Sequence, residues 1–108
     1  MSWRYQPVWI DDPSGDRVFS LCEVHFGPDE TLKHWTEDAN AFPIGVDDIG
    51  ELTGDLAYML VDAYRWKPVA FNSLYVGMSF ERAISAKQAE ALASLVENMA
   101  HNMAEAAS

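Results

Sequence analysis

The chain has 108 residues, a mass of 12.1 kDa and a formal net charge of −10 at pH 7. We expect residues 1–108 to fold as a single domain, because 49% of them are hydrophobic and thirteen are aromatic. The single cysteine, Cys22, excludes an internal disulfide framework and fits a reducing compartment. No apolar run approaches the roughly 20 residues of a membrane-spanning helix, so we expect a cytoplasmic location.

The negative charge is confined to the first part of the chain. Residues 1–62 carry thirteen acids against three bases, a net charge of −10, whereas residues 63–108 carry four of each. A field of this sign repels nucleic acid and attracts cationic surfaces. We therefore expect no direct contact with nucleic acid, no membrane association, and a basic protein as the partner.

Three strand-like segments open the chain. Residues 3–10 are rich in aromatic and β-branched side chains, and Pro7, which has no N–H to donate, favours the edge of a sheet. A turn at residues 12–16, which contains proline and glycine, leads to a second strand over residues 17–26. Another turn leads to a shorter strand over residues 32–38. The pattern predicts an antiparallel meander.

A helix over about residues 48–65 follows, and Asp47 is its predicted N-cap. At about 100° per residue, one arc of this helix gathers apolar side chains and is expected to pack on the sheet. The apolar arc contains Ile49, Leu52, Leu56, Met59, Leu60 and Ala63. A second arc contains Asp48, Glu51, Asp55, Tyr58 and Asp62.

The last third of the chain predicts one more strand and one more helix. Lys67-Pro68 ends the first helix, and alternating apolar residues over 74–80 predict a fourth strand. Ser85 and Gln88 form a capping box before a helix over residues 86–105. The apolar stripe of this helix, spaced by three and four residues, either packs on the domain's own sheet or forms a homodimer seam. The stripe contains Ala89, Leu92, Val96, Met99 and Met103.

The predicted fold is therefore α+β. It has a three- or four-stranded antiparallel sheet with a β-β-β-α core, covered by two amphipathic helices.

Residues that could carry catalysis or hold a metal do not form a recognisable site. Cys22 and His25 have the spacing of a metal pair or of a nucleophile with its base, but an odd separation on a strand sends them to opposite faces. Convergent carboxylates, a Gly-rich phosphate loop and a nucleophile elbow are not recognisable either. We predict no catalytic residue, no metal and no cofactor, and a protein that is not an enzyme.

The second arc of the first helix is the preferred site for a partner. Its consecutive carboxylates are about one turn, or 5.4 Å, apart and loosely imitate spaced phosphates. No lysine or arginine precedes Arg65 on this helix to neutralise them. Tyr58 offers an aromatic anchor in the same arc. The alternative is that these acids are only a solvated polar face. The predicted partner-binding residues are Asp48, Glu51, Asp55, Tyr58 and Asp62.

The order strand–strand–strand–helix, with a helix that opens Asp47-Asp48-Ile49-Gly50-Glu51-Leu52, resembles the HicB-like antitoxin domain over residues 3–66. The resemblance implies an antitoxin-type protein of bacteria or phages. It does not extend to the DNA-binding tail of many HicB proteins, because residues 67–108 carry no net positive charge. No site residue is carried over.

Two further likenesses concern short segments and composition. In size and charge the chain is similar to phage-encoded inhibitors such as anti-CRISPR proteins. A group of small bacterial proteins of unknown function looks similar in short segments. These segments are Trp3-Arg4-Tyr5, Glu23-Val24, Trp35-Thr36-Glu37-Asp38 and Glu51-Leu52…Asp55-Leu56…Met59-Leu60.

Two functions stay open on this basis. The first is a non-enzymatic acidic protein-binding module, of inhibitor or antitoxin type, that docks on a basic nucleic-acid-handling protein. The second is a homo-oligomeric structural or small-ligand-binding protein that uses an aromatic face of the sheet. That face would contain Trp3, Tyr5, Trp9, Phe19 and Trp35.

Overall fold

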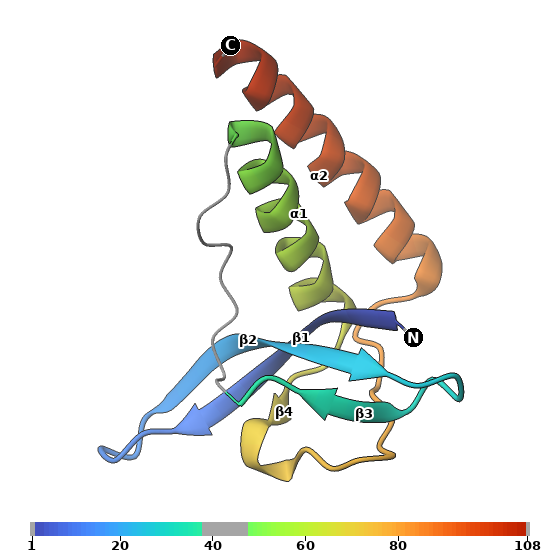
Figure 1. The fold of residues 1–108 in the computed structure, drawn as a ribbon. Coiled ribbons are helices and arrows are strands. Elements are labelled where there is room, and N and C mark those ends of the chain that lie inside the picture. The colour runs from blue at the N-terminus through green and yellow to red at the C-terminus, as the bar shows by residue number, and fades with distance from the viewer. Residues whose placement is uncertain (1, 38–47, 108) are drawn as a thin grey trace.

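The computed structural model describes residues 2–37 and 48–107, and it confirms the α+β class with four strands and two helices (Figure 1). In chain order the elements are β1 (Ser2–Asp11), β2 (Arg17–Phe26), β3 (Leu32–Trp35), α1 (Ile49–Arg65), β4 (Val69–Ala70), the short 3-10 helix η1 (Phe71–Ser73) and α2 (Ala86–Ala107).

The predicted antiparallel meander is formed by β1, β2 and β3, in a sheet of order β3-β2-β1-β4. β1 and β2 pair over all ten residues of each strand. Their turn is closed by the Asp12 carboxylate, which accepts the N–H groups of Ser14 and Asp16, and Gly15 adopts a positive φ of 94° that glycine tolerates. β3 ends at Trp35, earlier than the predicted strand.

The fourth strand differs from the prediction. β4 has only two residues and runs parallel to β1, whereas residues 74–80 form no strand. In that segment Leu74 and Met78 are buried, but the chain turns at Gly77, whose φ is 96°. The alternation of apolar residues in the sequence therefore does not correspond to alternating burial. The segment packs on the sheet without regular secondary structure, and we call residues 74–80 the strap.

β1 is an interior strand, so the edge position predicted from Pro7 is wrong. β4, however, pairs only with Val8 and Trp9. The first half of β1 is thus left without a strand on that side, and the end of α1 makes its contacts there.

The main apolar core lies on one face of the sheet and is covered by the segment from β4 to residue 80, not by the helices. Its buried members are Val8, Cys22, Val24, Phe26, Leu32, Leu74 and Met78. Half-buried Trp35, Val69, Phe71 and Phe80 pack around them, together with Ile10.

The helices α1 and α2 form an antiparallel pair that stands away from the sheet, with the C-terminal end of α1 nearest to it (Figure 1). The N-cap of α1 is Asp48, whose carboxylate accepts the N–H of Glu51 at 3.0 Å, while Asp47 lies outside the described residues. α2 begins at the predicted capping box, in which Ser85 and Gln88 exchange hydrogen bonds. In the part of the chain that the structure describes, neither helix combines the length and the apolar character that crossing a membrane requires.

Polar contacts from β1 hold the C-terminal end of α1. The backbone N–H of Tyr5 donates to the Asp62 carboxylate at 2.9 Å. The fully buried side chain of Gln6 donates to the carbonyl of Lys67, also at 2.9 Å. Both bonds join residues about sixty positions apart in the chain, so they fix where the helix leaves the sheet.

Arg4, the preceding residue of β1, makes the third contact. Its guanidinium lies 3.8 Å from the centroid of the Trp66 ring and 5.0 Å from that of Phe80. Burial lowers the pKa of Arg4 to about 9, against the opposing charge of Asp62, so the guanidinium remains charged at neutral pH. A desolvated cation between aromatic faces is a strong form of the cation–π interaction.

The apolar arc of α1 does not face the sheet, contrary to the prediction. Met59 is buried, but Ile49 is 53% exposed, Leu56 49% and Leu60 45%. The polar contacts at the end of the helix set its orientation, and they leave most of this arc in solvent.

A pair of leucine truncations tests this division between core and surface. Leu32→Ala should lower the free energy of unfolding by about 2–5 kcal/mol, because Leu32 is fully buried. Leu56→Ala should change it by less than about 1 kcal/mol in the monomer, because half of that side chain is already in water. Urea unfolding followed by circular dichroism at low protein concentration measures both values. An equal loss of unfolding free energy in both variants would contradict an orientation of α1 that leaves Leu56 in solvent.

Candidate docking surface

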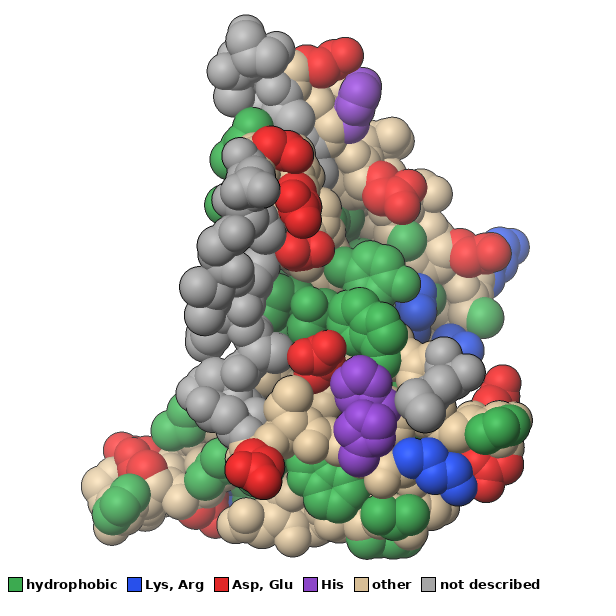
Figure 2. Space-filling model, in the orientation of Figure 1, with side chains coloured by type: hydrophobic (Ala, Val, Ile, Leu, Met, Phe, Trp, Pro, Cys, Tyr) green, Lys and Arg blue, Asp and Glu red, His purple; other side chains and the backbone are tan. Residues whose placement is uncertain are grey.

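Three carboxylates define what we call the acid face of α1: Asp48, Glu51 and Asp55. Asp48 and Glu51 are exposed and Asp55 is half-buried. Figure 2 shows acidic side chains in a column along this helix. Tyr58, one turn further on, is also exposed, so four of the five predicted partner-binding residues lie at the surface.

The acid face is not neutralised by the chain itself. Among the described residues, no lysine, arginine or histidine forms an ion pair with Glu51 or Asp55. Arg65, the one base on α1, instead lies 3.9 Å from Asp62. The two carboxylates are therefore open to a cationic partner at short range, where screening by salt is incomplete.

Asp62 is not part of this surface, so its prediction as a partner-binding residue is wrong. It is only 1% exposed and accepts the N–H of Tyr5. Desolvation raises the pKa of Asp62, and the bond from Tyr5 and the charges of Arg4 and Arg65 oppose that rise. One signal in the sequence marks it as different: a carboxylate near the end of a helix is disfavoured by the helix dipole.

An aromatic cluster of Trp3, Tyr5 and Tyr58 lies beside the acid face. The Trp3 and Tyr58 rings are inclined by 28°, with centroids 6.4 Å apart, and Tyr5 meets Trp3 edge-on at 5.4 Å. Burial and the nearby charges of Asp55 and Glu23 raise the pKa of Tyr5. Asp55 of the acid face is therefore near enough to the aromatic cluster to act on Tyr5.

Two stacked histidines extend this surface across the sheet. The rings of His25 and His34 are 4.3 Å apart, and His25 is 6.4 Å from Trp3. In Figure 2 two histidine side chains (purple) lie directly below hydrophobic side chains (green). Cys22 is buried on the opposite face of the sheet, as the strand spacing predicts. Within residues 2–37 and 48–107, no three metal-ligating side chains come together.

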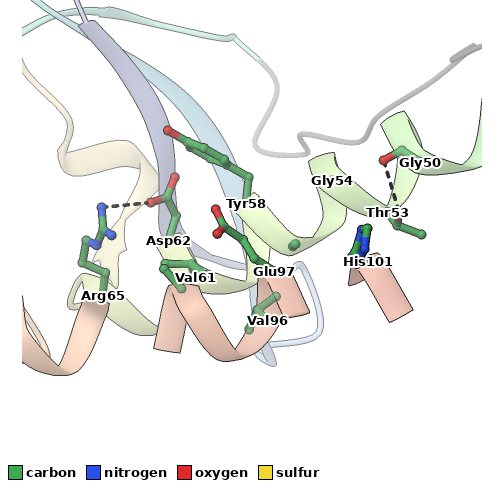
Figure 3. A pocket seen from close by; sticks show the side chains of 12 residues that line it. Gly50, Thr53, Gly54, Tyr58, Val61, Asp62, Arg65, Val96, Glu97 and His101 are labelled. Atoms are coloured by element: carbon green, nitrogen blue, oxygen red, sulfur yellow. Dashed lines mark hydrogen bonds and ion pairs between the residues drawn. The ribbon is translucent and has the colours of Figure 1, made fainter. Parts of the chain in front are cut away.

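A groove of about 610 Å³ runs between α1 and α2 next to the acid face. Figure 3 shows Tyr58 and Asp62 of α1 and Glu97 of α2 turned toward the same space. Gly50 and Gly54 form part of its wall, and a Cβ added at Gly54 would meet no atom within 4 Å. The groove is thus open to an inserted side chain. Its charged lining is mixed: Asp62 lies next to Arg65, and Glu97 and His101 come from α2.

The five aromatic residues of the alternative site do not share one face. Trp35 pairs with Val24 on the core side of the sheet, whereas the other four lie on the opposite face. The Arg17 guanidinium also covers the Trp9 ring at 3.6 Å from its centroid. Trp3, Tyr5 and Tyr58 are the aromatic residues that meet at the acid face.

Substitutions at Asp62 separate its structural role from docking. Asp62→Ala should lower the free energy of unfolding by about 1–3 kcal/mol at pH 7, because the N–H of Tyr5 loses its acceptor. Asp62→Asn should cost less, since an amide oxygen can accept the same bond. Stabilities of both variants equal to that of the parent protein would show that Asp62 does not fasten the helix.

The pH dependence of the same pair has a defined sign. Because the pKa of Asp62 is raised by folding, the folded protein binds a proton at a pH where the unfolded chain has released it. The contribution of Asp62 to stability therefore grows as the pH falls through its folded-state pKa, and it levels off below the lower pKa of the unfolded chain. Urea unfolding at a series of pH values should show that the free energy of unfolding of the parent rises relative to that of Asp62→Asn as the pH falls over this window. A difference independent of pH would contradict a raised pKa.

Comparisons with known proteins do not identify a family. No protein-family model, curated protein or solved structure matches this chain. The case for a function therefore depends on the geometry of the acid face, the aromatic cluster and the groove.

Proposed function

We propose that this chain is a non-enzymatic acidic protein-binding module, of inhibitor or antitoxin type, that docks on a basic nucleic-acid-handling protein. The observation that carries the proposal is the pair Glu51 and Asp55, which form no ion pair among the described residues and lie beside exposed aromatic rings. A surface of this kind is complementary to the lysine- and arginine-rich surfaces that bind nucleic-acid phosphates.

The aromatic cluster gives this surface more than charge. Trp3 is 48% and Tyr58 61% exposed, so a large part of each residue is accessible to a partner. A guanidinium that reaches Asp55 can also stack on an aromatic face, and Arg and aromatic residues are the commonest anchors of protein interfaces. The groove between the helices gives a second place for a long cationic side chain, between Tyr58 and Glu97.

Charge at such a surface acts mainly on the rate of association. Opposite fields steer the partners together, and the acceleration falls as salt screens the charges. Asp48 contributes to the field but also caps α1, so its substitution would disturb the helix. Glu51 and Asp55 are the residues that can be changed with the least effect on the fold.

Charge reversal tests the proposal. The parent protein is used as bait in a lysate of its native host, and the captured basic proteins are identified and purified. The double variant Glu51→Lys/Asp55→Lys should slow association with such a partner by about tenfold or more at low salt and flatten its salt dependence. Biolayer interferometry at low and high salt measures both effects.

The matched control reverses two exposed acids elsewhere, Asp16→Lys/Glu30→Lys. Both double variants change the net charge by the same four units, but Asp16 lies in the turn between β1 and β2 and Glu30 lies in the turn before β3. The control should associate nearly as fast as the parent. Equal slowing by both variants would show that only net charge matters, and unchanged binding by the acid-face variant would exclude this surface.

A further inference from the structure

An uncharged apolar face covers the helix pair on the side away from the acid face. Six exposed or half-exposed side chains define it: Ile49, Leu56, Leu60 and Tyr64 on α1, with Leu95 and Met99 on α2. Each is between 45% and 59% exposed, and together they are half of the large hydrophobic side chains exposed in the described part of the chain.

Helix geometry places the two halves of this apolar face on the same side of the pair. Tyr58 and Glu97 both line the groove, on α1 and α2 respectively (Figure 3). At about 100° per residue, Leu60 lies about 160° around α1 from Tyr58, and Met99 lies about 160° around α2 from Glu97. Because α1 and α2 are antiparallel, both rotations lead to the side opposite the groove (Figure 1).

No charge interrupts the apolar face. On α1 the arc of about 120° around Ile49 contains only apolar residues and Thr53. On α2 the arc of about 140° around Met99 likewise contains no acid or base. By the same geometry, Glu51 and Asp55 lie on the other side of α1, and Glu97 lines the groove. A chain of net charge −10 therefore has one surface that a second copy can approach without bringing carboxylates together.

The surface area and the radius of gyration of the chain both exceed those of a compact monomer of its size. The whole chain exposes 7221 Å², whereas a monomeric protein of its mass is expected to expose about 6,000 Å². Its radius of gyration is 15.1 Å, against about 13 Å for a compact domain of this length. The excess surface, roughly 1,200 Å², exceeds the about 800 Å² that each partner buries in a standard interface.

We infer that two copies of this chain associate through their apolar faces into a four-helix bundle with twofold symmetry. The same patch meets itself in such an interface, so α1 and α2 of each copy contribute equally. This inference is independent of the proposed docking function. It also differs from a seam made by the apolar stripe of α2 alone, because Ala89 and Val96 of that stripe are already buried within the chain. The side chain of Met103, in the same stripe, lies outside the described residues.

Sedimentation equilibrium of the full chain, from micromolar to near-millimolar concentration, tests the inference. The expected particle has twice the monomer mass of 12.1 kDa. Added salt should tighten the dimer, because it screens the repulsion between two acidic copies. A monomer at every concentration and salt level would overturn the inference.

Two variants locate the interface. Leu60→Glu and Met99→Glu should each raise the dimer dissociation constant by at least about 100-fold, because twofold symmetry buries each new charge twice. Val76→Glu is the matched control, since Val76 is 63% exposed but lies in the strap on the sheet. Leu60→Gln and Met99→Gln give the same test if either charged variant loses its circular dichroism spectrum. If the folded variants have the same dimer dissociation constant as the parent, the apolar face is not the dimer interface.

Salt separates this inference from the proposed function. Docking on a basic partner weakens as salt rises, whereas the dimer strengthens. Glu51→Lys/Asp55→Lys should leave the dimer intact, and Leu60→Glu should leave the acid face intact. The experiments can therefore contradict the docking function without contradicting the dimer, and the reverse.

Discussion

The position of the helix pair depends on three consecutive residues of β1. Arg4 stacks on Trp66, the N–H of Tyr5 binds Asp62, and Gln6 binds the carbonyl of Lys67. These contacts are possible because β4 pairs with only two residues of β1 and leaves the rest of that side uncovered. The end of α1 thus completes the sheet edge with side-chain hydrogen bonds in place of a strand. Buried polar contacts of this kind require one geometry, whereas apolar contacts tolerate several.

Much of the fold follows from local sequence signals. The turn at residues 12–16, the pairing of the first two strands and the capping box at Ser85 are confirmed, because each depends on residues close in the chain. The strap over residues 74–80 could not be derived from alternation, since Gly77 turns the chain between two buried residues. Pro7 predicted an edge strand because proline has no N–H to donate. β1 is nevertheless interior, because the two-residue strand β4 pairs with Val8 and Trp9, and nothing in the sequence of β1 indicates that pairing.

The candidate site shows the same limit. A helical wheel separates acids from apolar residues on α1, and it identified Glu51 and Asp55 as surface residues. The wheel cannot tell which arc meets the sheet, and here the buried contact is made by a carboxylate, Asp62, while Leu56 and Leu60 remain in solvent. The aromatic cluster was also beyond the sequence, because Tyr58 and Trp3 meet only when the end of α1 is fixed on β1.

The two faces of the helix pair have opposite chemistry. The acid face and the groove lie on one side, and the uncharged apolar face lies on the other. A dimer formed through the apolar faces would present two acid faces pointing outward, each with its own aromatic cluster. Such an arrangement would bind a repeating cationic surface with an avidity greater than that of either face alone.

The attachment of the helix pair at one end has a consequence for local unfolding. Asp62 and its neighbour Val61 are buried, and Asp62 is tied to the sheet by the N–H of Tyr5. The amides near Gly50 and Gly54 lie far from the sheet and next to helix-weakening glycines. Fraying can therefore begin at the free end of α1 without breaking the sheet core. Amide hydrogen exchange should become slower along α1 toward β1. The local stability of the helix would then be highest where it contacts the sheet and lowest where its carboxylates are exposed.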